Sequence, residues 1–196
     1  MAIFKPAVNV VLAHEQGFAD VVGDAGGPTN YGVSLRYLRT LGDTDEDGWM
    51  DGDFDRDGDV DRDDIIKMEE SDAIKIYHDQ WWARYHYGLI HATHQTIATK
   101  ILDLSINMGP RRVDKHGKVW GAHIILQRAV NAIAGHRLTL DGWLGPKSFA
   151  AINNADPHAL VVDFRLEALE YYNVLIARNP MLVKFKKGWH RRAVSI

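Results

Sequence analysis

Apolar positions recur at helical spacing along most of the chain. In residues 6–12 they follow a proline that suits the first turn of a helix, and Val8, Val11 and Leu12 fall on the same face as Glu15. The same periodicity predicts further helices over residues 34–41, 71–85, 96–108, 125–133 and 157–178, with one more after Gly145-Pro146. The expected fold class is therefore all-α with a minor β-hairpin.

Ser34 and Ser71 suit the caps of the helices expected over residues 34–41 and 71–85. Two of the expected helices have a clear apolar face. The face of residues 71–85 consists of Ile74, Tyr77, Trp81 and Tyr85. The residues of 157–178 expected to point inward are Leu160, Phe164, Ala168, Tyr171 and Leu175. Aromatic rings at this spacing usually belong to a core, so we expect most of them to be packed inside the protein.

A turn-rich stretch follows the first predicted helix. Gly17 suits the left-handed conformation that ends many helices. The run from Asp24 to Pro28 predicts a tight turn, flanked by residues 21–22 and 31–33 as a short hairpin. Glycines in this turn would let the backbone come close to a ligand.

Three residues of this stretch form a candidate set for acid–base chemistry. Glu15 is predicted at the last turn of an apolar-faced helix, where burial and the negative helix end favour a protonated carboxyl group. Such a group can act as a general acid, with Asp24 as base and the Thr29 hydroxyl positioning a water. The spacing alone also fits a plainer interpretation, in which Glu15 is a solvated helix-end charge and Asp24 an ordinary turn residue.

An acidic segment occupies residues 43–64 and contains twelve acidic residues and two arginines. Its second half fits the twelve-residue pattern of a calcium loop, with oxygen ligands at positions one, three and five and glycine at six. The expected ligands are Asp53, Asp55, Asp57, the backbone carbonyl of Asp59, a water held by Asp61, and Asp64. Aspartate at the last position resembles dockerin loops and is expected to weaken the affinity.

A second, overlapping loop starts ten residues earlier. Its candidate ligands are Asp43, Asp45 and Asp47. Its twelfth position is Phe54, so Asp51 or Asp53 would have to supply the missing oxygen. The expected cofactor is structural calcium, with one ion in the later loop and a second if both loops bind. The alternative is a solvated, disordered acidic loop, although so many like charges repel strongly without a cation.

Composition narrows the class of protein. A chain of 196 residues with 46% hydrophobic content forms one domain, or one domain with two lobes, and has no cysteine for disulfide or thiol chemistry. The formal net charge is −3, but residues 43–64 carry −10, which leaves +7 elsewhere. That basic remainder suits an anionic polymer such as the cell wall, although scattered solubilising charges explain it equally well. The N-terminus lacks the pattern of a signal peptide, so a cytoplasmic location is expected.

The stretch from Glu15 to Gly32 resembles the signature of the phage and bacterial N-acetylmuramidases of glycoside hydrolase family 108. It also resembles the Glu, Asp and Thr triad of phage-type lysozymes, although Gln16 replaces the glycine usual in the family. Further segments that match the family are residues 81–85, 103–109, 126–129, 141–147 and 188–189.

The resemblance implies a lysozyme-like fold and a phage-type endolysin that hydrolyses the β-1,4 bond between N-acetylmuramic acid and N-acetylglucosamine. Glu15 would protonate the leaving oxygen, while Asp24 and Thr29 would activate water. The residues expected to bind the glycan are Tyr31, Trp81, Tyr85 and Asn107. The protein would be a monomer that binds peptidoglycan, without a nucleic-acid partner or stable membrane insertion, and a holin would release it from the host cytoplasm.

The expected organisation is a catalytic lobe over residues 1–110, with the acidic insert at 43–64, and a C-terminal helical lobe over 111–196. Residues 141–147 of that second lobe resemble peptidoglycan-binding helical modules. Two other functions fit parts of the sequence. A lytic transglycosylase would use Glu15 alone, and a non-enzymatic, calcium-dependent wall-binding protein would need only the acidic loops and the C-terminal lobe.

Overall fold

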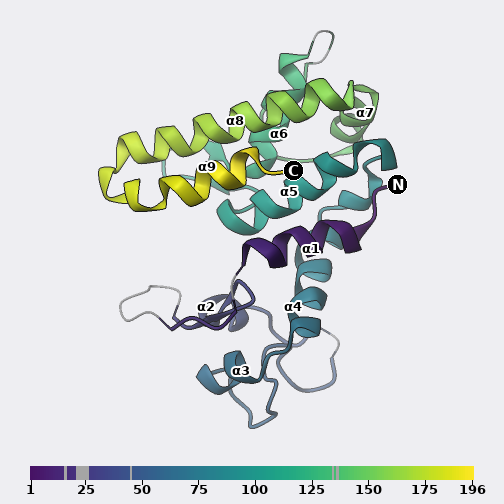
Figure 1. Ribbon diagram of the computed structural model, residues 1–196. Helices are drawn as coiled ribbons and strands as arrows, with labels where there is room; N and C mark the ends of the chain where they lie inside the picture. Colours follow the sequence, from purple (N-terminus) through teal and green to yellow (C-terminus); the bar gives the residue numbers. More distant parts are fainter. Residues whose placement is uncertain (16, 21–26, 45, 134, 136) are drawn as a thin grey trace. The chain divides into compact units, whose positions relative to one another are not determined.

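The computed structural model describes the chain except residues 16, 21–26, 45, 134 and 136 (Figure 1). It contains two compact units. The smaller unit is Val11–His78, and the larger consists of Met1–Val10 and Asp79–Ile196. The boundary expected at residue 110 does not coincide with this division, because residues 79–110 pack with the C-terminal helices.

Helix α1 begins in the larger unit and ends in the smaller one. The other elements of the smaller unit are short, and their bounds follow in chain order. They are α1 (Phe4–His14), β1 (Thr29–Asn30), β2 (Val33–Ser34), α2 (Leu35–Leu38), α3 (Arg62–Lys67) and α4 (Glu70–Tyr77). Ser34 caps α2 as expected, since its side chain accepts a hydrogen bond from the backbone N–H of Tyr37.

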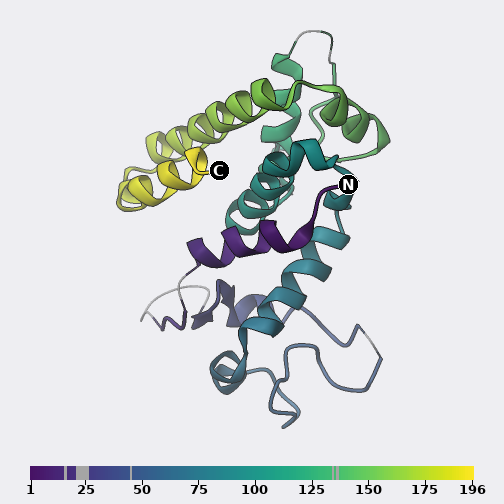
Figure 2. The same cartoon turned by 45° about the vertical axis from the view of Figure 1, so that its right-hand side comes forward.

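The larger unit contains the long helices, and the longest of them, residues 157–178, lies beside the C-terminal helix, residues 186–194, in Figures 1 and 2. After a π-helical turn, η1 (His78–Ala83), come two 3₁₀ turns, η2 (Tyr87–Leu89) and η3 (Ala92–His94), then α5 (Gln95–Met108). The remaining elements are β3 (Arg112–Val113), β4 (Val119–Trp120), α6 (Ala122–Ala132), α7 (Pro146–Asn154), α8 (Pro157–Arg178), η4 (Pro180–Phe185) and α9 (Lys186–Val194). The expected all-α class with minor hairpins is confirmed, and no described helix has the length and apolar character needed to span a bilayer.

Helix α8 is central to the larger unit and packs against α6 and α9. Its bounds agree with the prediction, because Asp156 caps it and Pro157 occupies its first turn. Leu160, Phe164 and Ala168 are buried as expected. The fourth buried position is Tyr172, however, and not Tyr171, because a step of four residues continues the stripe.

The segment predicted as one helix over residues 71–85 is interrupted. Its α-helical part begins at Glu70, where the N–H of Glu69 bonds to the carboxylate of Asp72, so Ser71 is not the cap. The π-helical turn then shifts the buried face, since each of its hydrogen bonds spans one additional residue. Trp82 is consequently buried, whereas Trp81 is half-buried.

A polar network joins four segments of the larger unit through Tyr87, Ser105, His123 and Gly142. The Nδ1 atom of His123 lies 3.0 Å from the carbonyl oxygen of Gly142, and its Nε2 atom 2.8 Å from the Tyr87 hydroxyl. A carbonyl can only accept, so Nδ1 carries the proton and Nε2 accepts from Tyr87. Tyr87 in turn accepts from the hydroxyl of Ser105 at 2.8 Å. Burial lowers the pKa of His123 to about 4, which keeps the ring neutral.

Candidate functional site

Glu15 lies directly after the last residue of α1. Its backbone N–H still donates to the carbonyl of Val11 at 3.0 Å, so its side chain leaves the final helical turn as expected. Val8 and Val11 on the same face are buried, and Glu15 itself is half-buried. Gly17 does not adopt the left-handed conformation that was expected of it. The chain instead continues to Ala19, which pairs with Thr29 through two hydrogen bonds of 2.8 Å.

The β1–β2 hairpin brings a tight turn against Glu15. Its two turn residues, Tyr31 and Gly32, have positive φ angles of 46° and 81°, as the tightest two-residue hairpin turns require. They therefore form the turn, although residues 31–33 were expected in a strand. A Cβ atom on Gly32 would lie 2.5 Å from Cγ and 2.8 Å from Cδ of Glu15. The bare backbone of Gly32 thus provides the space that the Glu15 side chain occupies.

Tyr77 holds the same turn from α4. Its hydroxyl donates to the carbonyl oxygen of Tyr31 at 2.7 Å, and it lies 2.6 Å from the position of a Gly32 Cβ atom. The ring of Tyr77 is buried. The sequence periodicity predicted a core position for Tyr77, but the role of its hydroxyl depends on a contact with a residue 46 positions away.

Of the other two candidate catalytic residues, the structure describes Thr29 but not Asp24. Asp24 lies outside the described residues, as do Val21 and Val22. Thr29 lies in β1, opposite Ser34 of β2, and is half-buried. Its hydroxyl group donates a long hydrogen bond of 3.5 Å to the carbonyl oxygen of Gly27.

Asn30 is a site residue that the sequence did not reveal. It is buried in β1, and its Nδ2 atom donates to the carbonyls of Ile65 at 3.0 Å and Met68 at 3.2 Å. Ile65 lies within α3 and Met68 is its C-terminal cap, and the first residues of α3 are also the last residues of the acidic segment. Arg62 of α3 adds an ion pair of 3.0 Å with Asp20. The acidic segment is therefore connected directly to the hairpin beside Glu15.

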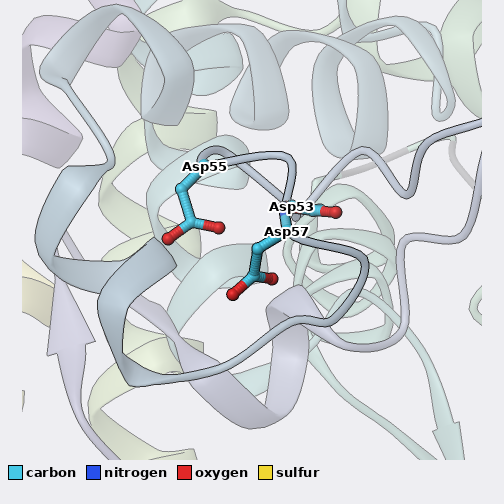
Figure 3. A group of neighbouring side chains, drawn as sticks. All are labelled: Asp53, Asp55 and Asp57. Carbon is cyan, nitrogen blue, oxygen red and sulfur yellow. The ribbon is translucent and has the colours of Figure 1, made fainter.

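The later acidic loop has the turn expected for calcium binding. Asp53 accepts hydrogen bonds from the N–H groups of Asp57 at 3.2 Å and Gly58 at 3.0 Å, and Gly58 has a φ of 103°. The carboxylates of Asp53, Asp55 and Asp57 come within 4.8 Å of one another (Figure 3). Asp59, Asp61 and Asp64 form a second such group. The six expected aspartates are thus gathered as two neighbouring groups in one loop.

Asp64 closes this loop. It is 1% exposed, and its carboxylate accepts from the N–H groups of Phe54 at 2.7 Å, Asp55 at 3.3 Å and Asp61 at 2.7 Å. One oxygen of Asp55, Oδ1, is buried and has no hydrogen-bond partner, while Oδ2 pairs with Lys67 at 2.7 Å. Lys67 lowers the pKa of Asp55, and repulsion from Asp57 raises the pKa of Asp59. A buried, unpartnered carboxylate oxygen among oxygen donors fits a hard cation such as calcium.

The earlier loop repeats this geometry ten residues upstream. Asp43 accepts from the N–H of Gly48 at 3.0 Å, as Asp53 does from Gly58, and Gly48 has a φ of 93°. Asp47 accepts from the N–H of Trp49 at 2.9 Å. The carboxylate of Asp51 accepts from the backbone and hydroxyl of Thr44, so it closes this loop much as Asp64 closes the later one. Asp45 lies outside the described residues.

The proposed glycan-binding residues divide between the two units. Tyr31 belongs to the smaller unit with Glu15, whereas Trp81, Tyr85 and Asn107 belong to the larger one. Trp81 and Tyr85 are half-buried, and the Tyr85 ring contacts His123 at 5.1 Å between centroids. Asn107 is exposed at the end of α5, where its Oδ1 accepts from the Tyr172 hydroxyl at 2.7 Å.

Comparisons with known proteins gave two family matches and a similar solved structure. A family model described as glycosyl hydrolase 108 matches residues 8–109, more than half of the chain. A second, described as a predicted peptidoglycan domain, matches residues 121–194. A solved structure of Brucella abortus SagA superimposes with a TM-score of 0.66 at 22% identity, covering 97% of this chain and 88% of that one. No curated protein matches. The structural likeness confirms the expected all-α, lysozyme-like fold class.

Proposed function

The chain belongs to the glycosyl hydrolase 108 family, and from this premise we propose that it cleaves the β-1,4 bond between N-acetylmuramic acid and N-acetylglucosamine, with Glu15 as general acid. The family makes it a glycoside hydrolase that acts on peptidoglycan. The strongest support for choosing Glu15 as the general acid is a single observation. Its half-buried side chain emerges from an apolar-faced helix and packs onto the bare backbone of Gly32, within the segment that matches the family.

In the proposed reaction, Glu15 donates its proton to the glycosidic oxygen as the bond to the anomeric carbon breaks. Asp24 removes a proton from a water on the opposite face of the sugar ring, and that water oxygen bonds to the anomeric carbon. Thr29 orients the water through its hydroxyl group. This division of roles inverts the anomeric configuration, which requires carboxyl groups about 6.5–9.5 Å apart. A separation nearer 5 Å would favour retention through a covalent intermediate.

We further propose that the later acidic loop holds a structural calcium ion. Asp53, Asp55, Asp57, Asp61 and Asp64 would bind it through carboxylates or a held water, together with the backbone carbonyl of Asp59. The buried free oxygen of Asp55 and the turn at Gly58 support this assignment. The repeated geometry of the earlier loop supports a second ion at Asp43, Asp45 and Asp47, with Asp51 in place of the missing twelfth ligand.

The calcium ion would act on hydrolysis indirectly. It would neutralise the repulsion within the loop and so stabilise α3, whose carbonyls accept from Asn30. Asn30 lies in the hairpin whose turn packs against Glu15. The ion would therefore stabilise the position of Gly32 and would contribute no step of the reaction itself.

The proposed biological role is that of a phage-type endolysin. The likeness of the Glu15 segment to phage and bacterial enzymes supports it. In that role the protein acts as a monomer on peptidoglycan after a holin releases it from the host cytoplasm.

The products of digestion test the reaction type. Purified peptidoglycan is digested with the full chain, and the fragments are analysed by mass spectrometry. Hydrolysis adds one water per cleaved bond and leaves a reducing N-acetylmuramic acid. A transglycosylase would instead leave 1,6-anhydro ends, each lighter by one water, and that product would contradict the assigned roles of Asp24 and Thr29. Glu69 and Glu70 are exposed carboxylates at the start of α4, and replacing either with Gln should not change the products.

A further inference from the structure

The larger unit contains a cavity that the proposed hydrolysis does not use. Its volume is about 420 Å³, within the range of small-molecule sites. The β3–β4 hairpin, the first half of α6 and the second half of α8 surround it, and all three lie within one compact unit. Much of its wall lies in residues 121–194, the part of the chain that matches the predicted peptidoglycan domain.

The inner wall of the cavity is apolar. Ile124 and Ile125 of α6 are 3% and 1% exposed, and Val174 and Leu175 of α8 also line the wall. An aromatic side is formed by Trp120, whose ring stacks on Tyr171 with 6.2 Å between centroids and 24° between planes. This explains why Tyr171 and Leu175 are only half-buried: they face the cavity and not the packed core.

The rim of the cavity is charged. Its basic side chains are Lys118, Arg128 and Arg178, and its acidic ones are Asp114 and Glu170. Arg128 is 3.8 Å from the carboxylate of Glu167, whereas Lys118 and Arg178 have no ion pair within the described chain. Burial raises the pKa of Tyr171 to about 12, so its hydroxyl remains neutral and can donate a hydrogen bond.

The cavity has an apolar wall and a rim with both basic and acidic side chains. These features fit one of the two components of peptidoglycan, the glycan strand and the stem peptide, better than the other. The glycan strand carries no charged group, because the lactyl carboxyl of muramic acid is joined to the peptide. The stem peptide carries free carboxylates, the ammonium of a diamino acid and the methyl groups of alanine. Carboxylates suit the cations Lys118 and Arg178, the ammonium suits Glu170, and the methyl groups suit the isoleucine wall.

We propose that this cavity binds the stem peptide of peptidoglycan and not its glycan strand. The inference rests on the proposed function only in taking peptidoglycan as the substrate. The bound peptide would keep the enzyme on the wall between cleavages. It would also make binding sensitive to the chemistry of the stem peptide, which differs among cell walls.

Binding of a synthetic stem peptide to the Glu15→Gln full chain tests the proposal. The probe is L-Ala–γ-D-Glu–meso-diaminopimelate–D-Ala, and the readout is the indole N–H signal of Trp120 in ¹⁵N-labelled protein, identified with Trp120→Phe. We expect a saturable shift of this signal. Arg178→Ala and Lys118→Ala should each weaken binding by about tenfold, the effect of losing one charge-assisted hydrogen bond. Arg191→Ala should bind like the parent, since Arg191 is exposed on α9 and does not line the cavity.

Three results would overturn the proposal. They are an unchanged Trp120 signal at saturating peptide, an equal shift with the N-acetylglucosamine tetramer, and equal affinities of the Arg178→Ala and Arg191→Ala variants. The probe has no glycosidic bond, and the Glu15→Gln chain would not cleave one. A failure here therefore leaves the hydrolase proposal intact, and unimpaired lysis by Glu15→Gln would leave the binding result intact.

Discussion

Gly32 has no space for a side chain, because it packs directly against Glu15, the proposed general acid. A Cβ atom would come within 2.5 Å of Glu15 Cγ and 2.6 Å of the Tyr77 hydroxyl, at a φ of 81°. We predict that Gly32→Ala displaces Glu15 and lowers the rate of peptidoglycan lysis at least about tenfold, since small misplacements of catalytic groups are costly. The turbidity of a cell-wall suspension measures this rate.

Gly117→Ala is the matched control for this prediction. Gly117 has a similar φ of 77° but no atom within 4 Å of the added Cβ. Both variants carry a backbone strain of about 1–2 kcal/mol, because alanine disfavours positive φ, and only Gly32→Ala carries the clash with Glu15. If the two variants lyse cell walls equally fast, Gly32 does not position Glu15.

The buried ring of His123 should make the free energy of unfolding depend on pH. Burial lowers its pKa to about 4 from 6.5, so between these values the unfolded chain binds more protons than the folded one. The free energy of unfolding should therefore fall as the pH drops from 6.5 towards 4, by up to about 3 kcal/mol. Urea unfolding at several pH values measures it.

His123→Gln should be less stable at pH 7 but lose less stability on acidification than the parent. Exposed His158 provides the matched control, because His158→Gln should retain the full pH dependence. An acid profile in which His123→Gln and the parent fall in parallel would show that His123 does not cause the loss.

The candidate catalytic residues were proposed from the sequence, but the contacts of those that the structure describes could not be. The resemblance pointed to Glu15, and the helical periodicity placed it beside Val8 and Val11. The contacts of Glu15 with Gly32, and of Tyr77 with Tyr31, depend on where a two-residue turn lies in three dimensions. Periodicity carries no information about such long-range contacts, which is also why Asn30 was missed.

Among the elements, helices with strong local signals were predicted well. Helix α8 begins where Asp156 caps it and Pro157 occupies its first turn. Helix α5 ends at Met108, because Gly109 has a positive φ of 86°. The π-helical turn at His78–Ala83 was not predicted, because a fixed period of 3.6 residues cannot anticipate one additional residue in a turn. That single insertion moved the buried position from Trp81 to Trp82.

The connection between the β1–β2 hairpin and α3 can be tested at Asn30. Asn30→Ala removes both hydrogen bonds to the carbonyls of Ile65 and Met68, so these buried acceptors lose their partner. We expect a loss of about 1–3 kcal/mol in stability and a lysis rate that no longer responds to calcium. Asn154→Ala, at an exposed position at the end of α7, should keep both properties. A calcium response that persists in Asn30→Ala would contradict the connection.

At the scale of the whole molecule, charge is divided unevenly. The acidic segment 43–64 carries −10 and the rest of the chain +7. Calcium bound to the acidic segment of the folded chain should reduce the repulsion there and raise the midpoint of thermal unfolding. At a calcium concentration a hundredfold above the dissociation constant, the free energy of unfolding should rise by about 2.7 kcal/mol. Differential scanning calorimetry with calcium and with a chelator measures this.

Two variants distinguish calcium binding at a specific site from nonspecific neutralisation of the acidic segment. Asp53→Asn removes a proposed ligand, so the calcium-induced shift should largely disappear. Asp63→Asn removes the same charge from an exposed position of the same segment that is not a proposed ligand, so the shift should persist. Equal shifts in both variants would contradict a specific site.

The role of Glu15 as general acid is tested by the rate at which the Glu15→Gln variant lyses cell walls. Glutamine has nearly the shape of glutamic acid but no acidic proton to transfer to the leaving oxygen. Lysis should therefore fall at least about a hundredfold, while the variant still sediments with cell walls. Glu70→Gln, on the surface of α4, should lyse walls at the parental rate. Lysis by Glu15→Gln at the parental rate would contradict the account.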